Sequence, residues 1–186
     1  MAIKIYVDQG HNPESPNAGA EGNGLKEQDI TYRVGAELGE LLRSNSSFEV
    51  RLSRPTPTTS LGSSNSTSLR ARVEDANAWG ADYFISIHTN ASSNPDASGT
   101  EAFAYSQPSA AFSLGEDIVQ NISRVTGLRN RGMQVRPGLY VLRRTDMPAV
   151  LAEIGFISNP SDAALMDSNP ALFARGIYNG IVQYLG

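Results

Sequence analysis

Two histidines stand among the 186 residues, and each follows an apolar run typical of a β-strand. His11 comes directly after residues 3–10 (IKIYVDQG), and His88 ends the run at residues 82–88 (DYFISIH). In open α/β sheets, the carboxyl ends of the strands form the edge at which ligands bind. Two imidazoles at such an edge suit zinc, copper, iron or nickel. The sequence therefore predicts a metal site, and the alternative is two hydrogen-bonded structural histidines.

The third ligand of such a site must be a carboxylate, because the chain contains no cysteine. Two histidines and a glutamate, with an open position for water, form a known catalytic zinc arrangement. Glu27 follows the loop that starts at His11, so the loop can fold back and bring both to one point. The alternative role of Glu27 is a favourable interaction with the dipole of the helix it begins. Asp8 and Asp29 are competing candidates for the ligand.

A second informative carboxylate, Glu153, lies inside the apolar run at residues 149–156 (AVLAEIGF). A buried charge is unfavourable unless it is paired or functional. Burial would raise the pKa of this carboxyl, as a general acid or base requires. The structural alternative is an ion pair with a buried arginine such as Arg143. Glu101, within the strand-like residues 100–105 (TEAFAY), is a weaker candidate of the same kind.

Strands that alternate with helices are needed to position these residues. Apolar residues with helical spacing predict helices at residues 27–43, 109–126 and from Pro170 onward, a helix capped by Ser68 and closed by Gly80, and a short helix ending at Met166. Strand patterns occur at residues 3–8, 48–52, 82–88, 100–105, 139–142 and 149–154. The alternation predicts a single α/β domain, with a mostly parallel or mixed central sheet of about six strands and helices on both faces.

Two connections bear on that sheet and on the predicted site. The eleven residues 89–99 are too few for a parallel crossover, which favours a mixed sheet. Residues 9–26 form a long loop without periodicity, and such loops inside compact domains are usually functional. Residues 53–68 are rich in Ser, Thr and Pro, so we expect a mobile surface loop or, as the alternative, a wall beside a cleft. Residues 127–137 are expected to be an irregular connection.

Length and composition fit one globular domain with a sizeable core, since 40% of the residues are hydrophobic and 18% are charged. The net charge of −4 argues against a nucleic-acid partner, which would require a basic patch. No polybasic segment or apolar run of roughly 20 residues indicates a membrane partner. The first residues lead directly into a strand, so we expect no signal peptide in this chain. The protein is then released by another route or is a domain cut from a longer precursor.

The motifs of this chain, taken in order, resemble those of the zinc-dependent N-acetylmuramoyl-L-alanine amidases, the type-3 amidase family of bacterial cell-wall metabolism. The resemblance covers nearly the whole length. Each motif is weak alone, but the ordered set is highly specific. The matching segments are residues 7–11 (VDQGH), 26–29 (KEQD), 52–54 (LSR), 69–72 (LRAR) with 76–77 (AN), 86–91 (SIHTNA), 99–101 (GTE), 131–132 (RG), 147–150 (MPAV) and 153–160 (EIGFISNP).

This resemblance implies one zinc ion per chain bound by His11, Glu27 and His88, with Glu153 as the catalytic glutamate. It implies hydrolysis of the amide bond between N-acetylmuramic acid and the L-alanine of the stem peptide. Asn90, Glu101 and Arg131 are possible substrate-contacting or supporting residues. The residues alone lead only to a metal-dependent hydrolase.

Two departures from the family pattern alter the loop after the first histidine. The family usually has Gly-His-Gly-Gly, whereas His11 is followed here by Asn12 and Pro13. Gln9 stands where proline or alanine is common. Both departures bear on the shape of the cleft more than on the ligand set.

The resemblance also implies a bacterial extracellular or cell-wall protein, which is an autolysin, a spore-associated enzyme or a phage lysin. Peptidoglycan is the expected partner, and a monomer is the expected state. Two alternatives remain at this point. One is a zinc peptidase that acts on cell-wall peptides, and the other is a non-catalytic wall-binding module on the same fold.

Overall fold

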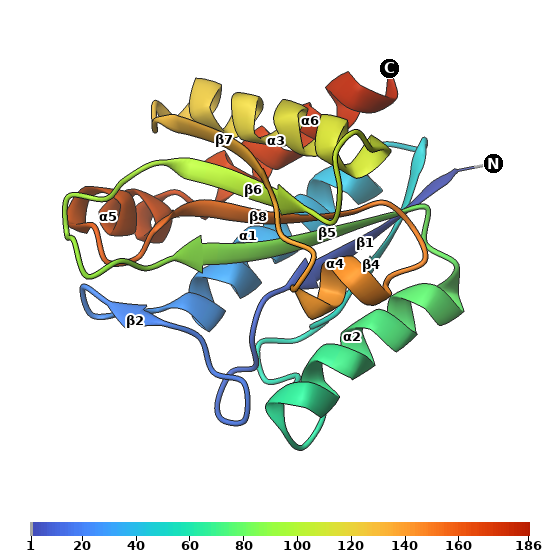
Figure 1. Ribbon diagram of the computed structural model, residues 1–186, viewed down its shortest axis with the longest axis horizontal. Coiled ribbons are helices and arrows are strands. Elements are labelled where there is room, and N and C mark those ends of the chain that lie inside the picture. The colour runs from blue at the N-terminus through green and yellow to red at the C-terminus, as the bar shows by residue number, and fades with distance from the viewer. Residues whose placement is uncertain (1) are drawn as a thin grey trace.

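The computed structural model describes residues 2–186 as one six-stranded sheet with helices on both sides (Figure 1). The sheet is built from strands β1 (Ile3–Gln9), β4 (Phe48–Leu52), β5 (Tyr83–Asn90), β6 (Thr100–Ala104), β7 (Asn130–Val135) and β8 (Ala149–Phe156). A separate small hairpin consists of β2 (Glu21–Gly22) and β3 (Leu25–Lys26). The helices are α1 (Glu27–Arg43), α2 (Asn65–Trp79), α3 (Ala110–Thr126), α4 (Tyr140–Arg144), α5 (Pro160–Ser168) and α6 (Pro170–Leu185).

The sheet is mixed, with strand order β4-β1-β5-β8-β6-β7. Strand β1 pairs in parallel with β4 and β5, and β5 pairs in parallel with β8. Strand β6 runs antiparallel to β8 and parallel to β7. The predicted mixed sheet of about six strands is therefore confirmed, and the two strands at one end of it, β6 and β7, run opposite to the other four.

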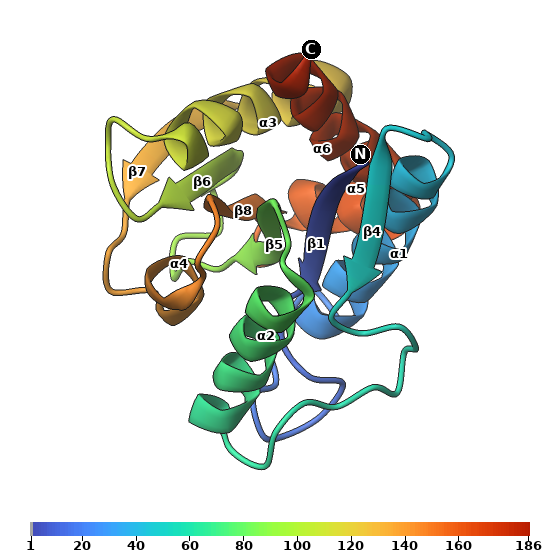
Figure 2. The ribbon, with the colours of Figure 1, turned by 90° about the vertical axis from the view of Figure 1, so that its right-hand side faces the viewer.

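Helices lie on both faces of the sheet (Figure 2), and each face has its own hydrophobic cluster. The larger cluster packs α1, α3 and α6 against one face, with fully buried side chains such as Ile30, Ile118 and Ile177. The smaller cluster packs α2 and α4 against the other face, around Tyr6 and Phe84, whose rings stack 5.4 Å apart. The face that carries α2 and α4 therefore has the smaller hydrophobic cluster.

The five helices that the sequence predicted are all present, and one of them begins at a different residue. Helix α1 spans the predicted residues 27–43, and α3 and α6 also begin where expected. Helix α2 is capped by Ser64 and not by Ser68, because the side chains of Ser64 and Thr67 form a reciprocal capping box. Ser68 is instead buried within the helix, and Gly80 closes it in a left-handed conformation as predicted.

Two predictions of secondary structure are wrong. Residues 139–142 were expected to form a strand, but they lie at the start of helix α4, which buries Val141 and Leu142. Residues 127–137 were expected to be an irregular connection, but they contain the edge strand β7. A short apolar run fits both a strand and a helix, and the polar residues of β7 are half-exposed at the edge of the sheet.

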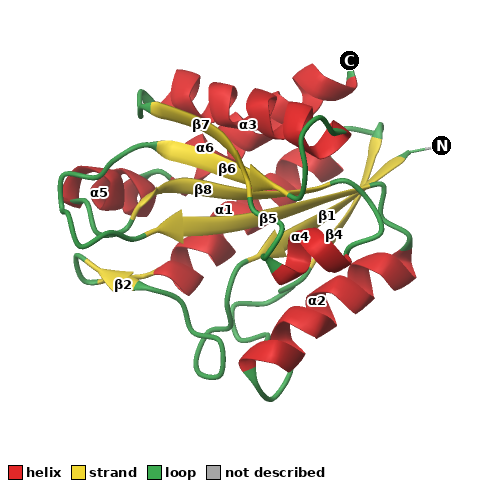
Figure 3. Ribbon diagram, viewed as in Figure 1, coloured by secondary structure: helices red, strands yellow, loops and turns green. Residues whose placement is uncertain are grey.

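The long connections after β1 and β4 lie on the lower side of the molecule in Figure 3. The first is residues 10–26, of which residues 10–20 are irregular as expected and the last six form the hairpin of β2 and β3. The second is residues 53–64, hereafter the β4–α2 loop. Its first two residues, Ser53 and Arg54, are buried, whereas residues 55–58 are exposed.

The chain begins and ends on the same side of the molecule, at the amino ends of the parallel strands (Figure 1). Near the carboxyl end of α6, the ring of Tyr184 packs edge-on against Tyr83 at the start of β5, with 6.1 Å between centroids. Over residues 2–186, none of the helices has the length and apolarity needed to span a bilayer.

Candidate metal centre and active site

The two histidines and Glu27 meet at the carboxyl edge of neighbouring parallel strands. His11 lies two residues beyond the end of β1, and His88 lies near the end of β5, which pairs with β1. Glu27 is the first residue of α1 and reaches the same point because the loop after β1 folds back through the β2–β3 hairpin. Strand pairing and a returning loop therefore bring together residues that are 16 to 77 positions apart.

The potential ligand atoms of these three side chains all lie within 4.8 Å of one another. His11 Nε2 is 3.2 Å from Glu27 Oε2, and His88 Nδ1 is 3.0 Å from Glu27 Oε1. The two imidazole rings meet edge to face, with 4.8 Å between centroids. Two imidazole nitrogens and one carboxylate form a donor set that fits zinc with a position left open.

Backbone groups orient Glu27 and His11, and His88 is oriented through its contact with Glu27. The amides of Ala20 and Thr89 donate to the two oxygens of Glu27, at 2.9 and 3.0 Å. His11 Nδ1 donates to the carbonyl of Asn17 at 3.2 Å, which leaves Nε2 directed at the carboxylate. Such outer contacts fix the tautomer and orientation of a metal-binding histidine.

Glu27 keeps its negative charge although it is only 4% exposed. Burial disfavours the charged carboxylate, but the hydrogen bonds and charges of His11 and His88 outweigh this effect and hold its pKa well below the usual range. The two competing carboxylates lie elsewhere. Asp8 forms a buried ion pair with Arg72, and Asp29 is exposed on α1.

Two glycines provide the space in which the ligands meet. A Cβ atom on Gly10 would lie 2.6 Å from His88 Cε1, and one on Gly19 would lie 2.8 Å from Glu27 Oε2. A real Cβ atom essentially never lies this close to a non-bonded atom, so a larger residue at either position would displace a ligand. This requirement explains two of the glycines in the loop after β1.

Glu153 lies beside the metal centre, on the neighbouring strand β8. Its register partners are His88 on β5 and Glu101 on β6, so the three side chains form one row across one face of the sheet. Glu153 Oε2 is buried and has no hydrogen-bond partner. Burial, with added repulsion from the charges of Glu27 and Glu101, raises the pKa of Glu153 to about 8.

The structural alternative for Glu153 is wrong. Across residues 2–186, the ion pairs do not include one between Glu153 and any arginine. Arg143 is exposed on α4. A buried carboxyl with an unpaired oxygen and a pKa near neutrality is typical of a group that transfers protons.

The three remaining candidate residues form a chain of contacts next to Glu153. Asn90 Nδ2 donates to Glu101 Oε1 at 2.5 Å, and Gln134 Nε2 donates to Glu101 Oε2 at 2.8 Å. Arg131 Nε lies 3.9 Å from Glu101 Oε2, and 34% of the arginine side chain is exposed. Glu101 is therefore held as a buried partner, whereas Arg131 reaches the surface. Gln134, on the unpredicted strand β7, was missed by the sequence analysis.

A small apolar cavity of about 120 Å³ adjoins both imidazoles. Its walls come from the metal-binding loop, α2, α4 and β8, and its apolar members are Leu69, Leu139, Tyr140, Val141 and Leu151. A larger hollow of about 760 Å³ lies between α1, β4 and the β4–α2 loop, and none of the candidate site residues lines it. The cavity beside the imidazoles is thus the one that a reacting group would share with the metal centre.

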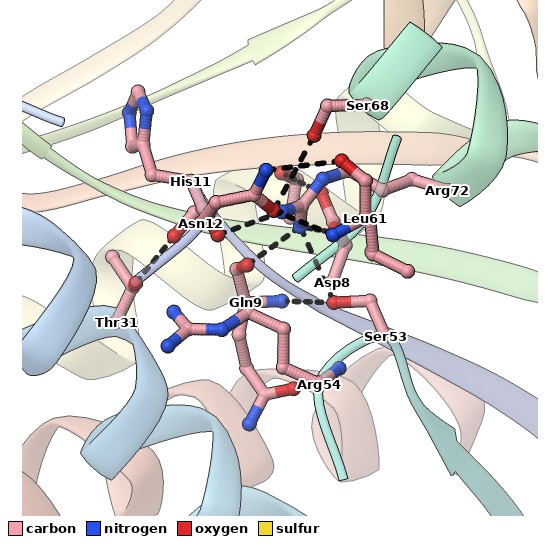
Figure 4. A network of polar contacts seen from close by, with 12 residues as sticks. Asp8, Gln9, His11, Asn12, Thr31, Ser53, Arg54, Leu61, Ser68 and Arg72 are labelled. Carbon is pink, nitrogen blue, oxygen red and sulfur yellow. Dashed lines mark hydrogen bonds and ion pairs between the residues drawn. The ribbon is translucent and has the colours of Figure 1, made fainter. Parts of the chain in front are cut away.

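A buried polar network beneath His11 is the largest feature that the sequence analysis missed (Figure 4). Its members are Asp8, Gln9, Asn12, Thr31, Ser53, Arg54, Ser68 and Arg72, all nearly inaccessible to solvent. Thr31 donates to the carbonyl of Gly10, and Arg54 donates to the carbonyl of Gln28, so the start of α1 is bonded both to the loop after β1 and to the β4–α2 loop. The sequence carried no signal for these contacts, because most of them join residues more than twenty positions apart.

The fold and the site together define a class, an α/β domain with a His–Glu–His cluster and a buried glutamate at the carboxyl edge of its sheet. A family model described as N-acetylmuramoyl-L-alanine amidase matches residues 5–183. The amidase CwlM of Bacillus licheniformis is 36% identical over 185 residues, which are 97% of this chain and 68% of that protein. The endolysin of Bacillus phage SPP1 is 34% identical over 193 residues, covering all of this chain and 67% of that protein.

A solved structure agrees with these sequence matches. The CwlD amidase of Clostridioides difficile, determined in complex with the GerS lipoprotein, superposes with a TM-score of 0.90 at 28% identity, over 98% of each chain. This chain belongs to the N-acetylmuramoyl-L-alanine amidase family.

Proposed function

We propose that this chain is a single catalytic domain, residues 1–186, that acts as a zinc-dependent peptidoglycan hydrolase. It cleaves the amide bond between N-acetylmuramic acid and the L-alanine of the stem peptide. One observation carries the proposal. In a member of the amidase family, the ligand atoms of His11, Glu27 and His88 lie within 4.8 Å of one another, and Glu153, whose Oε2 has no hydrogen-bond partner, is paired with His88 on the neighbouring strand.

His11, Glu27 and His88 would hold the zinc ion, and the contacts to Asn17, Ala20 and Thr89 would keep His11 and Glu27 aligned. When bound, zinc supplies Lewis-acid activation of the scissile carbonyl and of a water molecule. Glu153 takes the proton from the attacking water and passes it to the leaving amine. Its raised pKa suits this role, since a group that titrates near neutral pH can both accept and donate a proton.

The surroundings of Glu153 support contact with a peptide substrate. The apolar cavity beside the imidazoles has room for the small methyl groups that flank the scissile amide. Asn90 and Gln134 hold Glu101, and the charge of Glu101 raises the pKa of Glu153, so Asn90 and Glu101 act as supporting residues. Arg131 is partly exposed, which supports a role for it in contacting a substrate carboxylate.

We further propose that the chain acts on peptidoglycan outside the bacterial cytoplasm, as a monomer. An autolysin, a spore-associated enzyme and a phage lysin all agree with the relatives, since a bacterial amidase and a phage endolysin match it about equally well. The net charge of −4 supports an uncharged or mixed-charge polymer over nucleic acid as the partner. Size-exclusion chromatography with light scattering tests the monomer.

The test combines metal content with cleavage. Elemental analysis of protein purified without added metal should find one zinc ion per chain, which is lost in His88→Ala. The intact chain should release a peptide with a free L-alanine amino terminus from a muropeptide, as detected by mass spectrometry. A stem peptide that lacks N-acetylmuramic acid serves as the control and should remain intact.

The outcomes separate the alternatives. Cleavage of the bare stem peptide, with the muropeptide amide left intact, would identify a zinc peptidase instead. Zinc binding without cleavage of either substrate would identify a non-catalytic wall-binding module. Full zinc retention in both His11→Ala and His88→Ala would remove the ligand assignment.

A further inference from the structure

The backbone of His11 has a conformation that is uncommon for residues other than glycine. Its φ angle is 67°, in the left-handed region that residues other than glycine rarely enter. Such a conformation persists only where the surrounding structure enforces it. The contacts around His11 should therefore include groups whose role is to hold this ligand in place.

Arg72 on α2 donates hydrogen bonds to backbone carbonyls at and just before this strained residue. Its Nη1 atom donates to the carbonyl of Gln9 and to Asp8 Oδ1, both at 2.6 Å, and its Nη2 atom donates to the carbonyl of His11 at 2.7 Å. Arg72 and Asp8 are each 1% exposed, and Asp8 also accepts from Ser86 Oγ on β5. The guanidinium thus fixes the chain up to and including His11.

The next residue, Asn12, connects the chain after His11 to the β4–α2 loop (Figure 4). Its side chain is fully buried. Its Nδ2 atom donates to the carbonyls of Pro16 and Leu61, at 2.8 and 3.0 Å, and its Oδ1 atom accepts the amide of Leu61 at 3.0 Å. The side-chain amide of Asn12 therefore bonds both the backbone N–H and the backbone carbonyl of Leu61, as the backbone of an adjacent strand would.

The same residue also leads to the imidazole ring. The backbone N–H of Asn12 donates to the backbone carbonyl of Asn17 at 2.9 Å, and that carbonyl also accepts a hydrogen bond from His11 Nδ1. Asn17 in turn donates through its side chain to Ser68 Oγ at 3.0 Å. Continuous hydrogen bonds thus run from Leu61 in the β4–α2 loop, through Asn12 and Asn17, to the ring of His11.

We propose that Asn12 is a positioning residue that couples the β4–α2 loop to the metal ligand His11. This inference rests on the proposed zinc site. The family resemblance places glycine after the histidine, and glycine has no side chain to make these contacts, so the coupling belongs to this chain. Because coupling between two sites is reciprocal, zinc binding steadies Leu61, and loss of Asn12 weakens zinc binding.

The first test measures zinc affinity in Asn12→Ala by competition with a chelator of known affinity. The dissociation constant should rise by about 10- to 100-fold, the usual effect of losing an outer partner of a metal ligand. Asn121→Ala is the matched control. Asn121 is also buried and hydrogen-bonded, but it joins α3 to α6 on the other side of the sheet, so its loss should leave the zinc affinity unchanged.

The second test measures hydrogen exchange at the Leu61 amide with and without zinc. In the unaltered chain, zinc should slow this exchange by about the same factor by which Asn12→Ala weakens zinc binding. In Asn12→Ala, zinc should have no effect on Leu61. The amide of Thr59, which bonds within the loop to the carbonyl of Thr56, is the internal reference and should not respond.

Asn12→Asp keeps the inference testable if the alanine variant does not fold. It retains the acceptor for the Leu61 amide but loses the donor to Pro16 and Leu61, so it should weaken zinc binding while Leu61 keeps a partner. Unchanged zinc affinity in the folded Asn12 variant overturns the coupling and leaves the metal site intact. Absence of zinc binding in the unaltered chain instead overturns the proposed function.

Discussion

Glu27 is held in place before any metal arrives. Two backbone amides donate to its oxygens, and both histidines contact the same carboxylate. These contacts stabilise the charged form despite burial, so its pKa stays low and the carboxylate is ready to bind a cation. At the residue scale, the metal affinity of the site should depend on this one charge more than on the acidic residues around it.

Glu27→Gln should therefore weaken zinc binding by more than about 100-fold, since loss of an outer partner alone changes metal affinity by 10–100-fold. Asp29→Asn is the matched control, because it removes one negative charge only two residues away, from an exposed position. Its zinc affinity should equal that of the unaltered chain. Chelator competition measures both, and a stronger loss in Asp29→Asn would show that the wrong carboxylate was chosen.

Glu153→Gln should stop turnover and leave the zinc bound. The substitution keeps the size of the side chain but removes the proton-transferring group, so activity should fall by about 10²–10⁴-fold. The melting temperature should not fall, because Glu153 has no ion-pair partner to lose and its charge is opposed by Glu27 and Glu101. Muropeptide cleavage, zinc content and thermal unfolding are measured on the same protein.

A different pattern would assign Glu153 to the scaffold. That pattern is a much lower melting temperature with most of the specific activity retained. His88→Ala is the comparison variant, since it should lose zinc and activity together.

At the scale of elements, α3 and α6 approach each other closely through glycines. A Cβ atom on Gly180 would lie 2.5 Å from Ile118 Cα, and one on Gly176 would lie 2.7 Å from Ile122 Cα. The obstacles are backbone atoms, which cannot rotate away. The small residues of α6 therefore set the distance between the two helices.

Gly180→Ala should destabilise the protein, although alanine normally favours a helix over glycine by about 0.5–1 kcal/mol. Overpacking against backbone typically costs about 1–3 kcal/mol, which is the larger effect. Gly138→Ala is the control, because a Cβ atom there meets nothing within 4 Å. Thermal unfolding should show a lower melting temperature for Gly180→Ala alone, and an increase in that variant would contradict the close packing.

The elements that the sequence predicted are those with a strong local signal. Helix α1 has a clear apolar face, and β5 and β8 are long apolar runs that carry His88 and Glu153. Helix α4 and strand β7 have no such signal, since one is five residues long and the other is largely polar. Their structure depends on the sheet that they pack against, which local patterns cannot represent.

The same limit applied to the site. His11, Glu27, His88 and Glu153 were identifiable because their residue types stand out at strand ends or inside apolar runs. Arg72 stood out in the sequence only as part of a matching segment and Asn12 only as a departure from the family pattern, and the fold alone shows that they are buried against each other. The ligands were therefore predictable, but the network that holds them was not.

At the scale of the whole molecule, the site should lower the stability of the metal-free protein as pH rises. Burial and the nearby carboxylates raise the pKa of Glu153 to about 8 in the folded chain, from its ordinary value of 4.5. Between these values the folded chain keeps a proton that the unfolded chain releases, so the free energy of unfolding falls as pH increases. The lowered pKa of Glu27 acts below this window and does not mask the effect.

Chemical unfolding of chelator-treated protein at the two ends of that window measures this slope. Glu153→Gln should remove most of the slope, because glutamine does not titrate. A slope that is equal in the two proteins would mean that Glu153 is charged in the folded metal-free state.

Both chain ends emerge at the amino ends of the parallel strands, and the metal centre lies at their carboxyl ends (Figure 1). A tether attached at either terminus would thus leave the molecule on the side opposite the metal centre, and the metal centre would face away from the tether. Immobilisation on a bead through a terminal tag should leave an insoluble polymer free to reach the glutamate and the histidines. Attachment through the exposed residues 55–58 would turn the metal centre toward the bead and should block that access.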